Sequence, residues 1–280
     1  MDVLSRRPNI LFLVWVRTKN SHFLLNNKLR RPIYRIKLIN ALTTIENGIR
    51  DGEHFKIWTV NGKYHRGPSE DGKVRPAVIS YLEDGSKTKE WWIHGRIHRD
   101  KVNGVHLPAK IYYEGNKTRE EWYWWGMRHR AKVNRIQLPA IVDNGTRHSP
   151  QKTNVWYWHD LLHRVDGPAS IIGDLDYPTH YIWKFKGRFH HPDSNPDAME
   201  NPAVVTTFIN LDTKQWWYDG NLQLATIGDI IFMVKGVDII SINNLNGISK
   251  NIVKKYIHLL KQAMYNMSEL KDQQDLAAKK

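Results

Sequence analysis

The residues best suited to chemistry in this chain are five histidines that recur at regular intervals, four of them followed directly by an arginine. The histidines are His65, His98, His129, His163 and His190, and the arginines are Arg66, Arg99, Arg130 and Arg164. Imidazole nitrogens bind zinc and similar metals, and guanidinium groups bind phosphates. A metal-binding histidine column and a phosphate-binding arginine column are therefore the two chemistries to weigh.

The histidines belong to a repeated phrase that begins with a tryptophan seven residues earlier. Trp91–Arg99 reads WWIHGRIHR, and the frame recurs at Trp58–Arg66, Trp122–Arg130 and Trp156–Arg164, with degenerate copies at Trp183–His191 and Trp216–Leu224. A Pro-Ala pair follows each of the first five copies, at Pro76-Ala77, Pro108-Ala109, Pro139-Ala140, Pro168-Ala169 and Pro202-Ala203. Six copies spaced 27 to 34 residues apart indicate a repeat protein.

Each copy predicts a β-hairpin with a two-residue turn. Asn61-Gly62 is the dipeptide best suited to a type I′ turn, and counting outward from it places Trp58 opposite His65. The same register pairs Trp91, Trp122, Trp156 and Trp183 with their own histidines, and it sets Glu90 beside Arg99 and Glu121 beside Arg130. We therefore expect a structural role for the repeat Trp, His and Arg residues. Each His ring should pack on its facing Trp, and the arginines should pair with glutamates.

The register also argues against a shared metal site. An apolar strand after Pro-Ala, such as Ala109–Tyr113, gives each unit about three short antiparallel strands. Equivalent histidines would then lie roughly 14 Å apart, whereas zinc–histidine bonds are about 2 Å long. The fold class predicted is mainly β, an antiparallel meander of hairpin repeats in about six degenerate units with a C-terminal amphipathic α-helix. The segments between His-Arg and Pro vary in length, and such loops commonly carry recognition.

The phrase W-x3-G-x2-H-R-x2-G-P-A, most complete in Trp156–Ala169 with Asp160 at the Gly position, resembles the MORN-like repeats of large DNA viruses of the marseillevirus type. The resemblance covers Ile57 to Ala225, about 170 of 280 residues. Ordinary MORN repeats follow a GxYxGxxxxGxGxG-like pattern, from which this chain departs in its Trp, His-Arg and Pro-Ala. The resemblance implies an elongated antiparallel sheet used for protein or membrane-surface interaction, and it implies no chemistry.

The N-terminal region, residues 1–56, is predicted to be a basic arm with short strands. It carries 11 basic and 4 acidic side chains, a net charge of +7 out of +14 for the chain. Its candidate contacts to a polyanion or partner are Arg30, Arg31, Arg35 and Lys37. An alternating segment, Arg31–Ile39, indicates a half-buried strand whose charges either contact a partner or protect a sheet edge. Gly48 and Gly52 are expected to mark a turn before the first repeat.

The C-terminal region, residues 226–280, is predicted to hold one more hairpin, around Lys235-Gly236, and then a helix capped by Ser249. The helix has an apolar stripe that includes Tyr256 and Leu259/Leu260, and a basic face that includes Lys254 and Lys255. We expect it to cap the repeat domain, residues 57–225, and to dock a partner. The tail from Lys271 is expected to fray.

Composition narrows the class of protein further. The chain has no Cys, which excludes disulfides and thiolate metal sites, and 12 Trp with 12 Tyr supply an aromatic core. No P-loop, G-x-S-x-G or HExxH motif occurs, so neither an enzyme nor a cofactor is predicted. The apolar run Ile10–Val16 is too short for a membrane span and lacks a cleavage site. A cytoplasmic chain is expected, or one in the virion or host cytoplasm if viral.

These observations favour a non-enzymatic repeat scaffold for protein–protein contacts, a structural or capsid-type component of a large DNA virus. The viral part follows from the resemblance alone. A nucleic-acid-binding protein that uses the basic arm and a sheet face is the first alternative, and a carbohydrate-binding module with exposed Trp is the second. A membrane surface is the less favoured partner, and the sequence points to no particular oligomeric state.

Overall fold

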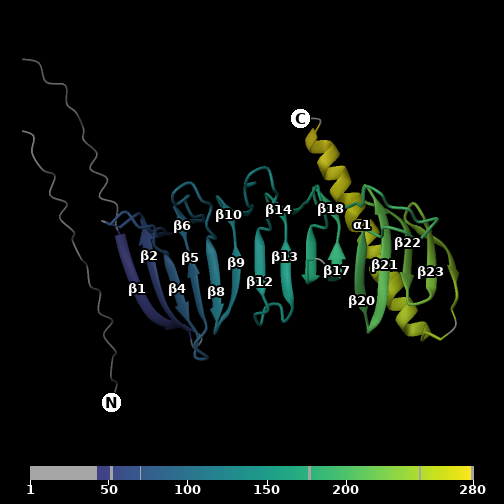
Figure 1. Ribbon diagram of the computed structural model, residues 1–280, viewed down its shortest axis with the longest axis horizontal. Coiled ribbons are helices and arrows are strands. Elements are labelled where there is room, and N and C mark those ends of the chain that lie inside the picture. The colour runs from purple at the N-terminus through teal and green to yellow at the C-terminus, as the bar shows by residue number, and fades with distance from the viewer. Residues whose placement is uncertain (1–42, 51–52, 70, 176–177, 246, 279–280) are drawn as a thin grey trace, which may run out of the picture.

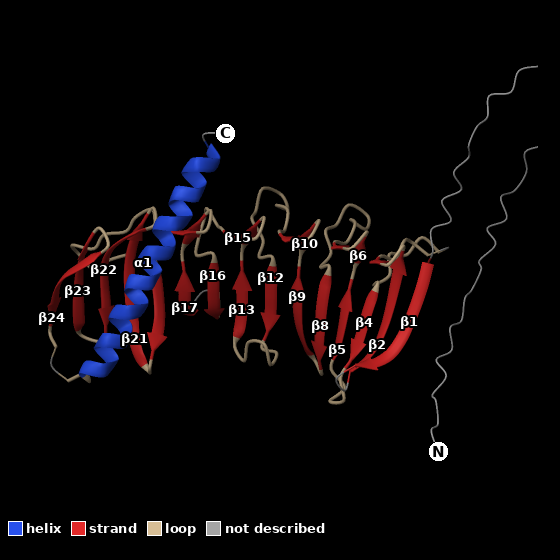
Figure 2. Ribbon diagram, turned by 180° about the vertical axis from the view of Figure 1, so that it is seen from behind, coloured by secondary structure: helices blue, strands red, loops and turns tan. Residues whose placement is uncertain are grey.

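The computed structural model describes residues 43–50, 53–69, 71–175, 178–245 and 247–278. Within them the chain forms one long, single-layer antiparallel sheet, in which strands follow one another in chain order from β1 to β24 (Figure 1). A single helix lies at the C-terminal end (Figure 2). The predicted fold class, a mainly β hairpin meander with a C-terminal helix, is confirmed.

The main sheet takes two strands from each repeat. It begins with β1 (Thr43–Arg50) and β2 (Glu53–Val60), whose end pairs with β3 (Lys63–Tyr64). The repeats then add β4 (Val78–Tyr81), β5 (Lys87–Glu90), β8 (Lys110–Glu114), β9 (Lys117–Glu121), β12 (Ile141–Asn144), β13 (Lys152–Val155), β16 (Ser170–Gly173), β17 (Pro178–Ile182), β20 (Val204–Phe208) and β21 (Leu211–Tyr218). It ends with β22 (Asn221–Ile227), β23 (Ile230–Lys235) and β24 (Asp238–Asn243).

A row of small hairpins runs along one edge of the main sheet (Figure 1). It consists of β6 (Trp92–Ile93) with β7 (Arg96–Ile97), β10 (Tyr123–Trp124) with β11 (Met127–Arg128), β14 (Tyr157–Trp158) with β15 (Leu161–Leu162), and β18 (Lys184–Phe185) with β19 (Arg188–Phe189). The prediction of three strands per unit in one meander is therefore wrong. Each of these units gives two strands to the sheet and two to the row, because the chain turns out of the sheet at the repeat Trp.

The turns of the row have the predicted type. Both central residues have positive φ in every copy, for example 51° and 72° at Asn61-Gly62 and 48° and 96° at Trp125-Gly126. This backbone defines a type I′ turn. Asp160 holds the Gly position of its copy at a φ of 64°, and its carboxylate compensates by accepting a hydrogen bond from the Arg128 N–H at 2.8 Å.

The start of the sheet differs from the sequence-based expectation. Gly48 does not begin a turn, because it lies inside β1, where a Cβ would meet the Phe55 ring at 2.8 Å. The predicted boundary at residue 56 falls within β2, and the boundary at 225 falls within β22. The apolar run Ile10–Val16 and the strand predicted at Arg31–Ile39 lie outside the described residues.

The helix α1 (Lys250–Ala278) crosses one face of the sheet diagonally, over the C-terminal strands (Figure 2). It begins as predicted, since the Ser249 hydroxyl accepts a hydrogen bond from the Asn251 N–H at 3.4 Å. The hairpin before it turns one residue later than predicted, because Lys235 pairs with Asp238. The main core forms between helix and sheet from Trp217, Leu222, Ala225, Ile227, Ile230, Phe232, Val253, Tyr256, Leu260, Met264 and Met267.

The helix does not fray at Lys271 as predicted but continues to Ala278. Two contacts with the fifth repeat explain the extension. Leu270 lies against the turn at Gly187, and the Gln274 side-chain amide donates to the Lys186 carbonyl at 2.8 Å. The helix thus covers the final strands and also holds the last small hairpin.

Leu260 and Leu259 provide a matched test of this packing, because they differ in exposure and share their chemistry. Leu260 is 1% exposed in the core and Leu259 is 45% exposed. We expect Leu260→Ala to lower the free energy of unfolding by about 2–5 kcal/mol. Leu259→Ala should change it by less than about 0.5 kcal/mol. Urea denaturation measures both, and equal losses would show that α1 is not packed on the sheet as described.

Candidate functional site

The predicted histidine register is confirmed, but the rings do not pack where we expected. The His98 N–H donates to the Trp91 carbonyl at 2.9 Å, as a facing pair requires. The His98 ring, however, stacks on Trp125 of the next repeat, with centroids 4.5 Å apart. His65 likewise stacks on His94, and His129 on His159. The expected packing of each His on its own Trp is therefore wrong, and the ring joins neighbouring repeats.

The histidines also bind the backbone of the next hairpin. We call the contact between one hairpin and the next a joint. In four joints the Nδ1 atom of the repeat histidine accepts a hydrogen bond from the N–H of the first turn residue of the next hairpin. The donors and acceptors are His94 to His65 (3.1 Å), Trp125 to His98 (3.4 Å), Lys186 to His163 (3.2 Å) and Asp219 to His190 (3.2 Å). A neutral imidazole that accepts at Nδ1 carries its proton on Nε2. The hydrogen bond accepted at Nδ1 therefore fixes the tautomer of these four histidines.

The second turn residue completes the connection between hairpins. Its N–H donates to the carbonyl just before the preceding His: Gly95 to Tyr64 (2.8 Å), Gly126 to Ile97 (2.9 Å), Asp160 to Arg128 (3.0 Å), Gly187 to Leu162 (2.8 Å) and Gly220 to Phe189 (2.9 Å). Each hairpin thus supplies acceptors for the turn amides of the next, and the row is continuous.

The arginines stack on their own tryptophans instead of pairing with glutamates. The guanidinium carbon lies 3.8 Å from the Trp58 ring centroid for Arg66, 3.9 Å from Trp91 for Arg99, 3.7 Å from Trp122 for Arg130 and 4.0 Å from Trp156 for Arg164. Each arginine also donates to the carbonyl of the repeat proline, at 3.0–3.4 Å. This planar cation–π contact uses the face of the guanidinium, and the hydrogen bond uses its edge.

The glutamates expected to pair with these arginines have other partners. Glu90 binds Lys110 at 2.9 Å and accepts from the Trp92 indole, while Glu121 binds Arg119 at 2.8 Å. The predicted Glu90–Arg99 and Glu121–Arg130 pairs are therefore wrong. The strand is bent at the repeat Trp, so positions that face each other along a straight ladder diverge there.

The rest of the phrase closes the joint around the tryptophan. The alanines after proline are all 0% exposed, and Ala109 both accepts from the Trp91 N–H and donates to the Glu121 carbonyl. The indole of Trp91 donates to the carbonyl two residues before proline, at Val74. In the fifth copy His191 takes the arginine position and packs on Trp183 at 4.2 Å, so the joint persists although the residue has changed.

An exposed row of aromatic rings lies beside these joints. It comprises the residue two places after the repeat Trp in four consecutive hairpins, together with the preceding histidines. We call Trp124, Trp158, Phe185 and Tyr218, with His98, His129, His163 and His190, the aromatic stripe. The four outer rings are 36–51% exposed. From His129 to Tyr218 each ring contacts the next, with centroids 4.8–6.4 Å apart.

Sequence reasoning missed the four outer rings of the stripe. A signal was present, because an aromatic residue recurs at a constant offset from the repeat Trp, directly before the turn. Side chains at that place in a short hairpin have little sheet around them and remain exposed. The repeat tryptophans that we singled out are instead buried, with Trp91, Trp122 and Trp156 only 4–6% exposed.

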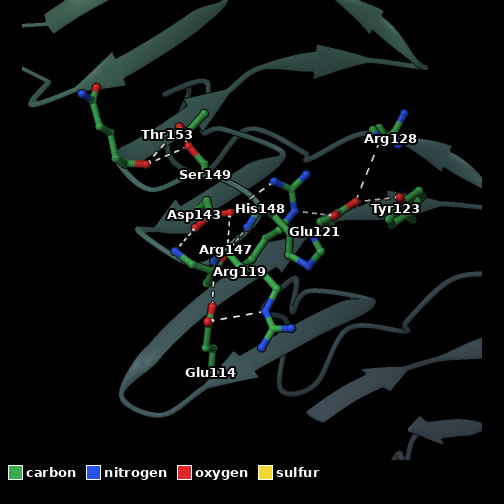
Figure 3. Close-up of polar contacts among 12 residues, drawn as sticks. Glu114, Arg119, Glu121, Tyr123, Arg128, Asp143, Arg147, His148, Ser149 and Thr153 are labelled. Atoms are coloured by element: carbon green, nitrogen blue, oxygen red, sulfur yellow. Dashed lines mark hydrogen bonds and ion pairs between the residues drawn. The ribbon is translucent and has the colours of Figure 1, made fainter. Parts of the chain in front are cut away.

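A second polar cluster lies on the face of the sheet that carries α1, because the strand register aligns Glu121 with Ile182 and Val204, which pack in the core under the helix. Figure 3 shows its residues. Arg119 binds Glu121 at 2.8 Å and the buried Asp143 at 3.2 Å, and the Tyr123 hydroxyl donates to Glu121. Burial raises the pKa of Glu121, but the hydrogen bonds from Arg119 and Tyr123 outweigh it and hold that pKa below its usual value.

Arg147 joins this cluster to two other repeats. Its side chain pairs with Asp84. It also pairs with Glu114, whose carboxylate accepts the Arg147 backbone N–H at 2.7 Å (Figure 3). A hollow of about 410 Å³ beside it is lined by Lys110, Tyr112 and Arg119 among others. Its cations Lys110, Arg119 and Arg147 are all paired with carboxylates. We therefore assign this cluster to joining repeats.

The remaining candidate residues are separated from both features. Lys254 and Lys255 are exposed on α1, on the side away from the sheet. Arg30, Arg31, Arg35 and Lys37 lie outside the described residues. Within the part of the chain that the structure describes, no three His, Asp or Glu side chains are grouped to hold a metal ion. No described helix is both long and apolar enough to span a membrane.

Comparison with known proteins leaves the geometry as the basis for function. No protein-family model matches the chain, and no curated protein matches it either. The outer rings of the aromatic stripe are exposed at regular positions of the described surface, and the stripe is the candidate binding site.

The arginine–tryptophan joint predicts that lysine cannot replace arginine. Arg99→Lys keeps the charge but loses the planar stack on Trp91, so it should lower the free energy of unfolding by about 1–2 kcal/mol. Arg96 is exposed on β7, and Arg96→Lys is the matched control, with an expected change within about 0.5 kcal/mol. If Arg99→Lys unfolds at the same urea concentration as the control, the stack is not stabilising.

The histidine joints predict that stability falls with acid. Burial, and then the neighbouring His159 and His106, lower the pKa of His129 from 6.5 to about 4. Between these values the unfolded chain binds a proton that the native chain does not, so stability is lost as the pH falls from about 6.5 to about 4. Because the His129 ring is only partly buried, we expect about 1–2 kcal/mol from this residue.

His129→Gln tests this assignment, because glutamine cannot take up the proton. The drop in unfolding free energy between pH 7.5 and pH 4 should shrink by about 1–2 kcal/mol relative to the unsubstituted chain. His54→Gln, at an exposed position of β2, is the control and should leave the drop unchanged. An identical drop in all three proteins would contradict the role of His129.

Proposed function

We propose that the chain is a non-enzymatic scaffold that binds another protein through the aromatic stripe. The observation that carries the proposal is the repeated exposure of large rings, 40% for Trp124, 43% for Trp158, 36% for Phe185 and 51% for Tyr218. Contiguous exposed apolar groups of this kind are typical of protein interaction sites. Trp and Tyr are also enriched among the residues that dominate binding energy.

The scaffold supports such a role because the rings are held rigidly. Each stripe ring is attached to a hairpin whose turn amides bind the preceding repeat, at 2.8–3.0 Å for the second turn residue. Few side-chain rotamers are then left to order when a partner binds, which lowers the entropic cost of association. A flat row of pre-positioned aromatic groups suits an extended partner better than a compact ligand.

We further propose that the protein is a structural component associated with the virion of a large DNA virus, and that its partner is a capsid or virion protein. This finer proposal is supported by the repeat phrase W-x3-G-x2-H-R-x2-G-P-A, most complete in Trp156–Ala169. Nucleic acid stays the alternative partner. Lys89 lies beside Lys87 and Arg99, since burial and then the positive charges of these two residues lower its pKa, and grouped cations suit contacts with phosphates.

Stripe variants test the protein-binding function. Trp158→Ala with Phe185→Ala should abolish capture of the partner from the native source, because both rings leave the surface while the buried joints stay intact. The measurement is affinity purification with quantitative mass spectrometry. Tyr81→Ala removes a comparably exposed ring, 45% exposed, from the far end of β4 and should retain the partner.

Only proteins captured by the unsubstituted chain and by Tyr81→Ala, and lost from the double variant, count as support. A partner set that is identical for all three baits would overturn the assignment of the stripe. Capture that disappears after nuclease treatment would identify nucleic acid as the partner instead, and quenching of Trp fluorescence by a glycan would favour a carbohydrate.

A further inference from the structure

Three rings of the aromatic stripe occupy equivalent positions in repeats that are two strands of the main sheet apart. Trp158, Phe185 and Tyr218 occupy the same offset in consecutive repeats, and between successive repeats the main sheet adds two strands. Neighbouring strands lie about 4.7–4.9 Å apart, so equivalent rings recur about every 9.4–9.8 Å. A ligand that uses all three rings must present an apolar group at that interval.

Hydrogen-bond donors alternate with these rings. His163 contacts Phe185 at 4.8 Å, and His190 contacts Tyr218 at 5.1 Å. Because both histidines accept a backbone N–H at Nδ1, their protons are on Nε2. Neither Nε2–H has an acceptor among the described residues, and both rings are only partly buried. The stripe therefore offers apolar faces and donors, which suits a ligand with unpaired carbonyl oxygens.

Three regular peptide conformations can be compared with this pattern. A β-strand repeats its side chains on one face about every 6.6–6.8 Å and brings its own N–H donors. Two turns of an α-helix span about 10.8 Å, and its carbonyls are bonded internally. A polyproline II helix repeats every three residues, or about 9.3 Å, and leaves its carbonyls free. Over the two intervals between three rings its mismatch stays below about 1 Å.

We propose that the aromatic stripe binds a proline-rich segment in the polyproline II conformation, with a proline at every third position on Trp158, Phe185 and Tyr218. Proline rings pack on aromatic faces, and proline has no N–H that would need an acceptor. The Nε2–H groups of His163 and His190 then donate to ligand carbonyls between the rings. This inference rests on the proposed protein-binding function and names the class of partner.

The charge beside the stripe specifies the ligand further. The Lys186 ammonium lies 5.5 Å from the centroid of the Phe185 ring. Burial lowers the pKa of His163, and the positive charges of Lys186 and Lys132 lower it further. Acidic residues between the prolines would meet these lysines, so the favoured ligand is proline-rich and acidic.

Titration with a synthetic peptide tests the inference directly. The probe is the acetylated and amidated dodecamer (Pro-Pro-Glu)4, added to the full chain while the Trp indole N–H signals are followed by NMR. The mirror-image peptide made of D-residues is the matched control, because it has the same composition and charge and the opposite helical hand. We expect saturable shifts with the L-peptide and at least about tenfold weaker binding of the D-peptide.

Variants place the binding on the stripe. Phe185→Ala should weaken the L-peptide by about tenfold or more, and Tyr81→Ala should leave its affinity unchanged. Trp158→Phe keeps an aromatic face and should retain most of the affinity, so it serves as a second probe if a truncation destabilises the fold. All titrations are run at the same pH, 7.5, and the dispersion of the NMR spectrum reports folding in each sample.

The outcomes separate this inference from the proposed function. Equal affinity for the L- and D-peptides, or L-peptide binding that Phe185→Ala does not weaken, would overturn the polyproline assignment. No binding of the L-peptide, with stripe-dependent capture of a protein intact, would overturn it while leaving the protein-binding function in place. If the L-peptide does not bind and no protein is captured through the stripe, both the polyproline assignment and the protein-binding function are overturned.

Discussion

The structure depends on where the amide groups of a type I′ turn find their acceptors. In a two-residue hairpin the N–H groups of the two turn residues point away from the hairpin that contains them. Here the first binds the imidazole of the preceding repeat in four joints, and the second binds a carbonyl of that repeat. Without its neighbour a repeat leaves these donors to water, so each contact between hairpins exchanges hydrogen bonds to water for hydrogen bonds within the chain. This constraint makes the row of hairpins continuous.

The same constraint produces the surface that we assign to binding. Once the turn amides hold the hairpins together, the ring before the turn stays exposed in four consecutive copies. Trp158 and Phe185 are exposed, although they sit next to buried joints. The arginine stacked on Trp122 and the fully buried Ala140 are needed only to stabilise the joint. The residues that stabilise the repeats and the residues that we assign to binding thus occupy adjacent positions of the same repeat.

Much of the local structure could be predicted from the sequence, because it depends on residues close together in the chain. The turn at Asn61-Gly62, the register that follows from it and the cap at Ser249 are of this kind. Contacts between repeats were mispredicted. Counting along a straight hairpin predicted that the His98 ring packs on its own Trp and that Arg99 pairs with a glutamate. The count does not show that the chain bends at Trp91 or that the next hairpin lies alongside.

The stripe was missed for a related reason. Its rings differ in type from copy to copy, so they do not stand out as a motif, and only the position before the turn unites them. The helix end was mispredicted because the tail Lys271–Ala278 is polar in sequence. The residue that it contacts, Lys186, lies 88 residues earlier in the chain than its partner Gln274. The exposure of these rings and the long-range contact of the helix depend on how the repeats pack together, and the local sequence does not specify that packing.

Hydrogen exchange at the turn amides tests the central claim most directly. In an isolated hairpin the amides of Gly126 and Gly187 would exchange freely with water, whereas here they donate to carbonyls of the preceding repeat. We predict that they exchange as slowly as amides within β9, and far more slowly than the turn amide of Gly104, for which the described residues supply no acceptor. Exchange of Gly126 and Gly187 as fast as that of Gly104 would contradict the account.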